Sequence, residues 1–154
     1  ASNAPFRGYA SELFEGGIHV ACMARWPGRL PAGVVDDRLM LTFELTASIL
    51  AAAGGKAPQD QPLDGGDVLG QITAGVVPTP RILFWRARRA DRTWKAVRQN
   101  NLKYIWRQDG EQMDEFLFDL TEDPGESRNL IESKSEAAQE LKQKLTRWEQ
   151  AMRQ

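Results

Sequence analysis

Four side chains near the start of the sequence are of types that could perform chemistry. Arg7 could bind an oxyanion, because a guanidinium donates paired hydrogen bonds to such a group. Glu15 could act as an acid or base, but it precedes two glycines, and we expect its carboxylate to accept backbone N–H groups in a tight turn. His19 is the single histidine of the sequence, so it has no histidine partner for a metal site, and we interpret it as structural.

The single cysteine, Cys22, could be a nucleophile or a core residue. It lies within an apolar run at residues 18–24, where burial would raise the pKa of its thiol. We therefore predict a core residue. One cysteine also excludes an intrachain disulfide.

Composition narrows the classes of partner. The sequence has 154 residues, of which 42% are hydrophobic, and its 20 basic and 21 acidic residues give a formal net charge of -1. This balance provides no overall positive field for a phosphate backbone, so we expect no nucleic-acid partner. No apolar run approaches the roughly 20 residues that a membrane-spanning helix needs, and we expect no membrane span.

The elements that must position these side chains begin with a loop over residues 1–17. The apolar run at residues 18–24 is bounded by Pro27 and Gly28 and predicts a buried strand. Asp36 and Asp37 could cap a helix that carries apolar residues at helical spacing and ends at Gly54. We expect that helix to pack on the strand, and a proline-rich loop to follow it.

Four strands are predicted in the second half, at residues 81–85, 94–98, 102–107 and 115–120, with turn-forming residues between them. Alternation in the third strand predicts one buried and one mostly wet face. Ser133 to Glu136 has a capping-box pattern, and the following helix carries an apolar stripe that should cover the sheet. The stripe consists of Leu141, Leu145, Trp148 and Met152.

Two groups of motifs carry a resemblance. Arg7-Gly8, then Glu15-Gly16-Gly17-Ile18, then Arg25-Trp26-Pro27-Gly28 resembles sulfatases of the arylsulfatase type, within the alkaline-phosphatase-like superfamily. Phe118-Asp119-Leu120, Asp123-Pro124-Gly125-Glu126 and Asn129-Leu130 resemble the run with which sulfatases close their last sheet. The resemblance covers only the last part of a sulfatase.

The resemblance implies an α/β fold, or α+β for the chain taken alone. Residues 1–57 would be the end of the large α/β domain, and residues 58–80 a connecting loop. Residues 81–154 would form a small four-stranded antiparallel sheet covered by a C-terminal helix.

The resemblance also implies hydrolysis of sulfate esters, with calcium in the complete enzyme and a periplasmic or extracellular location. Sulfatases use a cysteine converted to formylglycine within Cys-x-Pro-Ser-Arg or a close relative. Cys22 is followed by Met23-Ala24-Arg25 and does not match. We therefore assign no catalytic residue, and expect the chain to be inactive alone and to meet a sulfate-ester substrate only together with an upstream domain.

Three positions depart from the family pattern or match it in part. Asn3 lines up with a metal-ligand position, but Ser2 stands where the family has a carboxylate, and Ser2-Asn3-Ala4 is either native or a scar of tag removal. Ala10 stands where the family lysine would contact the sulfate. Arg7 either supplies that cation from another angle or is a structural arginine.

Two other functions remain open. The chain could be a degenerate sulfatase-like module kept for binding or assembly, or a phosphoesterase relative of the same superfamily, because fold analogy alone does not decide the substrate. We further expect an exposed apolar surface along residues 18–23 and self-association through it.

Overall fold

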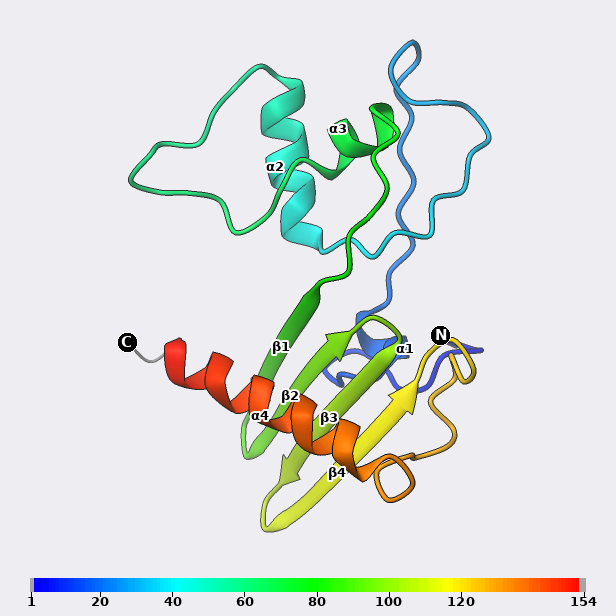
Figure 1. Cartoon of the computed structure of the whole chain (residues 1–154), viewed down its shortest axis with the longest axis vertical. Coiled ribbons are helices and arrows are strands. Elements are labelled where there is room, and N and C mark those ends of the chain that lie inside the picture. Colours follow the sequence, from blue (N-terminus) through cyan, green and yellow to red (C-terminus); the bar gives the residue numbers. More distant parts are fainter. Residues whose placement is uncertain (1, 153–154) are drawn as a thin grey trace. The chain divides into compact units, whose positions relative to one another are not determined.

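The computed structural model describes residues 2–152. The chain divides into two compact units (Figure 1), Ala1–Val20 together with Pro80–Gln154, and Ala21–Thr79. The first unit joins the N-terminal loop to the sheet across a long separation in sequence. The division into residues 1–57, 58–80 and 81–154 stays a prediction. Among the described residues, no helix has the length and apolar character needed to cross a membrane.

The sheet has four antiparallel strands in the order β1-β2-β3-β4, as predicted. Two-residue turns join neighbouring strands, and the first two of these turns begin with Ala90 and Asn100 at φ 53° and 56°, as tight hairpins require. The strands are longer than predicted because pairing continues up to each turn, although Arg81 and Leu120, predicted as strand ends, lie outside them. They are β1 (Ile82–Arg89), β2 (Arg92–Gln99), β3 (Leu102–Asp109) and β4 (Gln112–Asp119).

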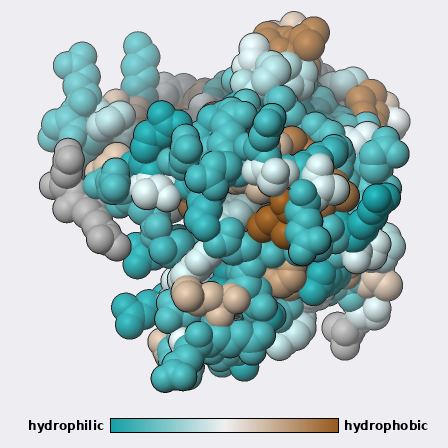
Figure 2. Space-filling model, turned by 60° about the horizontal axis from the view of Figure 1, so that its bottom comes forward, coloured by the Kyte–Doolittle hydropathy of each residue, from teal (hydrophilic) through white to brown (hydrophobic). Residues whose placement is uncertain are grey.

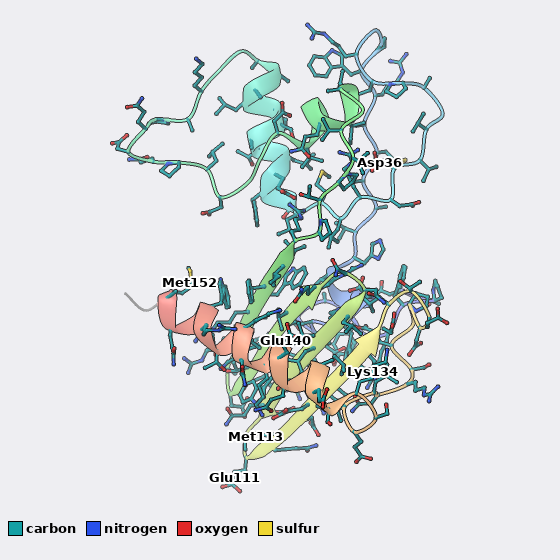
Figure 3. All side chains as sticks on the ribbon, in the orientation of Figure 1. Asp36, Glu111, Met113, Lys134, Glu140 and Met152 are labelled. Atoms are coloured by element: carbon teal, nitrogen blue, oxygen red, sulfur yellow. The ribbon has the colours of Figure 1, made fainter. Side chains whose placement is uncertain are left out.

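One face of the sheet is covered by α4 (Ser135–Ala151), as predicted (Figure 1). Leu141 and Leu145 are buried against the sheet, and the Trp148 ring stacks on Phe84 with 5.1 Å between ring centroids. Met152, predicted on the same stripe, is 69% exposed and lies at the end of the helix (Figure 3). The sheet residues of this core are Val97, Tyr104 and Leu117.

The other face of the sheet is also covered, so the predicted wet face is wrong. Leu13 and Phe14 of the N-terminal loop pack on Trp94, Ala96, Ile105 and Phe118. Lys103 and Ile105, which alternation placed on the wet face, have no exposed surface. The sequence pattern within a strand cannot reveal a covering segment about 90 residues away, which is why the prediction failed.

The predicted strand at residues 18–24 does not form. Glu15–Ile18 make a short helix, α1, and residues 19–26 run irregularly with exposed side chains. Cys22 is exposed rather than buried, which corrects the core prediction. A lone extended segment leaves its backbone groups unpaired, and none of the four strands of the described sheet pairs with it.

The second unit contains α2 (Thr42–Ala52) and α3 (Val68–Thr73). The predicted helix begins at Thr42 rather than after Asp36, because Asp36 Oδ1 accepts hydrogen bonds from Arg38 in a local turn. The helix α3, predicted as loop, is capped by Asp67 Oδ1, which accepts the Gly70 N–H at 2.8 Å.

The predicted capping box of α4 also does not form. Ser133 Oγ donates to the carbonyl of Leu130, three residues back, and the helix starts later, at Ser135. Serine hydroxyls readily make such local bonds in turns.

Candidate functional site

The candidate site is the N-terminal loop at residues 3–19, which carries the Arg7-Gly8 and Glu15-Gly16-Gly17 motifs and the predicted site residues Asn3 and Arg7. Its backbone is closed by the Gly16 N–H, which donates to Arg7 O at 2.7 Å. A Cβ on Gly16 would lie 2.5 Å from that same oxygen, and one on Gly17 would lie 2.3 Å from Glu12 O. Both positions therefore require glycine for close backbone approach, which explains the Gly-Gly pair.

A buried charge cluster, consisting of Glu15, Lys103 and Glu126, fixes this loop to the sheet. Lys103 Nζ donates to Glu15 Oε1 at 2.7 Å and faces Glu126 Oε1 at 3.0 Å, an ion pair without hydrogen-bond geometry. Lys103 and Glu126 have no exposed surface, and Glu15 is 6% exposed. Buried charges are tolerated when they are paired in this way.

Glu126 contacts the loop through its side chain and its backbone. Its Oε2 accepts the Glu15 N–H at 2.6 Å, and its carbonyl accepts a hydrogen bond from Arg7 NH1 at 3.0 Å. Burial raises the pKa of the Glu126 carboxyl above its usual value, against the opposing attraction of the Lys103 ammonium. The carboxyl thus lies in a strongly desolvated environment.

The structure corrects the interpretation of Glu15. Its carboxylate was expected to accept backbone N–H groups in a tight turn, but it pairs with Lys103. Arg98 NH1 lies 3.8 Å and His19 Nδ1 lies 3.4 Å from its other oxygen, Oε2. His19 also packs its ring on Phe6, with centroids 4.5 Å apart.

Lys103 is the residue that sequence reasoning missed. It stood in a strand on the face expected to be wet, where a lysine needs no explanation. Glu126 was recognised only as part of a turn motif. Its contacts with residues more than 100 positions earlier leave no local signal in the sequence.

Arg7, predicted to bind substrate, lies on the same loop. Its guanidinium carbon is 4.0 Å from the centroid of the Phe14 ring, in cation–π geometry, and the residue as a whole is exposed. These contacts orient the side chain. Its role in binding sulfate stays a prediction. Ala10, at the position of the family lysine, is exposed and provides no cation.

Asn3, predicted as a metal ligand, donates from Nδ2 to the carbonyls of Gly8 and Gly16 at 3.0 and 2.8 Å. It therefore braces the loop from outside. Among residues 2–152, no three His, Cys, Asp or Glu side chains gather in a way that could hold a metal ion. Calcium in a complete enzyme stays a prediction.

The second motif group, after β4, consists of local braces. Asp119 accepts from the Asn101 amide at 2.6 Å, and this bond, with weaker help from Thr121 and Lys134, holds the pKa of Asp119 below its usual range. Asn129 Oδ1 accepts the Leu117 N–H at 2.9 Å. These bonds shape the turn that delivers Glu126 to the N-terminal loop.

Known proteins resemble this chain over most of its length. The family model described as "N-sulphoglucosamine sulphohydrolase, C-terminal" matches residues 11–151. N-acetylgalactosamine-6-sulfatase of Canis lupus familiaris is 36% identical over 85 residues, which cover 55% of this chain and 16% of that protein. Arylsulfatase A of Bos taurus is 33% identical over 152 residues, covering 84% of this chain and 29% of that protein.

Two solved structures share the fold. Ps i-CgsB in complex with k-i-k-neocarrahexaose has a TM-score of 0.77 at 22% identity, covering 96% of this chain and 32% of its own. A structure from work on glycosaminoglycan metabolism by Bacteroides thetaiotaomicron has a TM-score of 0.72 at 22% identity, covering 92% of this chain and 31% of its own. The chain spans less than a third of the length of each of these relatives.

Proposed function

Because the chain belongs to the family of N-sulphoglucosamine sulphohydrolase C-terminal regions and is a C-terminal sulfatase domain, we propose that it supplies the rim of a sulfatase active site and the sheet that supports this rim. The reaction of the complete enzyme is hydrolysis of a sulfate ester. The nucleophile and most metal ligands belong to a preceding part of such an enzyme, so the chain alone is inactive.

One observation carries this proposal. The loop that bears the Glu15-Gly16-Gly17 motif is tied to β3 and to the segment after β4 by the buried cluster of Glu15, Lys103 and Glu126. The Glu15-Gly16-Gly17 motif and the motif that ends at Glu126 thus meet in space. A rim loop supported in this way could face a substrate held by another domain.

Arg7 is the residue of this chain that we propose to contact the sulfate. Arg7 is exposed as a residue, its guanidinium lies over the Phe14 ring, and a guanidinium can donate paired hydrogen bonds to two oxygens of an oxyanion. Ala10 cannot take this role.

The test is an assay of the isolated chain on an aryl sulfate with calcium present. We expect no turnover above a heat-denatured sample, while a complete arylsulfatase in the same buffer turns the substrate over. Clear turnover by the isolated chain would contradict the proposed inactivity. A parallel assay with an aryl phosphate addresses the phosphoesterase alternative, which turnover of that substrate alone would favour.

A further inference from the structure

Glu126 occupies a backbone conformation that favours glycine. Its φ is 52°, in the left-handed region, and it directly follows Gly125. Its carboxylate has no exposed surface, so burial adds a desolvation cost to the conformational one. Two unfavourable features at one residue indicate that the side chain has a task that glycine could not perform.

That task is visible in the contacts of Glu126. The carboxylate accepts the Glu15 N–H and pairs with Lys103, and the Glu126 carbonyl holds the Arg7 guanidinium. Arg7 and Glu15 are the first residues of the Arg-Gly and Glu-Gly-Gly motifs of this loop. Lys103, the second residue of β3, then joins Glu15 to Glu126 through its ammonium.

We propose that Glu126 and Lys103 are positioning residues that set the conformation of the loop from Arg7 to Gly17 for its role at the active-site rim. Their role at an active-site rim rests on the proposed function, whereas the positioning of the loop is a property of this chain. Lys103 pairs with both carboxylates through one ammonium, and Glu126 contacts the loop at Arg7 and at Glu15.

Hydrogen exchange of backbone amides, read by NMR on the whole chain, tests this proposal. The reporter is the Glu15 amide, which donates to Glu126 Oε2. The main variant is Glu126→Gly, because glycine relieves the left-handed backbone and the chain should still fold. We expect exchange of the Glu15 amide to accelerate at least tenfold, with amides in the middle of β2 and β3 changed less than threefold.

Two further variants separate positioning from general stability. Glu126→Gln keeps an oxygen that can accept the Glu15 N–H, so we expect exchange of this amide to stay within threefold of the parent value. Lys95→Met removes a comparable ion pair on the opposite face of the sheet, where Lys95 Nζ lies 2.8 Å from Glu149 Oε2. We expect no change at the Glu15 amide from that substitution.

Two results would overturn the proposal. The first is that exchange of the Glu15 amide is unchanged in Glu126→Gly, which would mean that the Glu126 side chain does not position the loop. A raised melting temperature of the same variant would strengthen this conclusion, because it would show that the position needs only a residue suited to the turn. The second is equal acceleration of all sheet amides, which would make the cluster a general stabilising feature. Neither result depends on sulfatase turnover, so failure here is distinct from failure of the proposed function.

Discussion

The glycine pair of the N-terminal loop shows how a sequence motif can be required by backbone packing alone. A Cβ added to Gly16 would lie 2.5 Å from Arg7 O, and a Cβ added to Gly17 would lie 2.3 Å from Glu12 O. No side-chain rotation relieves such a clash, because the opposing atom belongs to the main chain. The motif therefore follows from the closure of the loop on itself, without any catalytic demand.

Replacing Gly17 with alanine should therefore destabilise the chain. Since the loop must open to admit the methyl group, we expect a loss on the order of 1–3 kcal/mol in the free energy of unfolding. Denaturant unfolding followed by tryptophan fluorescence measures it. Gly66→Ala is the matched control, because the nearest atom to its added Cβ is the Gln71 amide nitrogen at an ordinary 3.8 Å. Equal midpoints for the two variants would show that the loop yields freely.

At the same scale, Lys103 marks what the sequence could not reveal about the site. Its neighbours Leu102 and Tyr104 lie on the face of the strand that alternation predicted to be buried, and they pack in the core beneath α4. Lys103 itself was read as a solvent-facing residue because its partners, Glu15 and Glu126, lie on other segments. A lysine can be predicted to be buried only when its acidic partners are known, and the partners of Lys103 were identified only in the structure.

At the scale of elements, the sheet and α4 were predictable because their signals are local. Alternating strands, two-residue turns and an apolar stripe at helical spacing each need only a few neighbouring residues. The short helix α3 and the covered second face were missed for the opposite reason. Asp67 caps the start of α3 by accepting the Gly70 N–H. The Leu69 N–H of α3 donates to Ser48 Oγ of α2, which lies 21 residues earlier in the sequence.

The apolar stripe of α4 leads to a prediction about this element. Leu145 lies on the face of α4 that packs on the sheet, and it is 4% exposed. Leu145→Ala should therefore lower the free energy of unfolding by about 2–5 kcal/mol, because burial is lost and a cavity remains. Met152, 69% exposed at the end of the same helix (Figure 3), is the control, and Met152→Ala should change stability by less than about 0.5 kcal/mol.

Denaturant unfolding of both variants gives the comparison. An unchanged slope against denaturant concentration would confirm that the native and unfolded states expose the same surface as in the parent. A Leu145→Ala chain as stable as the Met152→Ala chain would mean that α4 does not stabilise the sheet.

At the scale of the whole molecule, polar and apolar surfaces are unevenly distributed. The face shown in Figure 2 is mostly hydrophilic, with hydrophobic residues in separate groups. Several apolar side chains are highly exposed, among them Met23 at 95%, Val35 at 86% and Val77 at 80%. Single exposed apolar residues are ordinary, but several within the unit Ala21–Thr79 favour a surface that another chain segment covers.

This distribution predicts that the isolated chain binds an environment-sensitive apolar dye and self-associates. The expected site is the unit Ala21–Thr79, because the sheet unit buries its apolar residues on both faces. Val35→Ser combined with Val77→Ser should reduce both dye fluorescence and the mass measured by static light scattering. Met113→Ser is the control, since Met113 is 65% exposed at the tip of the β3–β4 hairpin (Figure 3). A strictly monomeric parent chain without dye binding would contradict the prediction, and it would mean that these side chains do not form a continuous apolar surface.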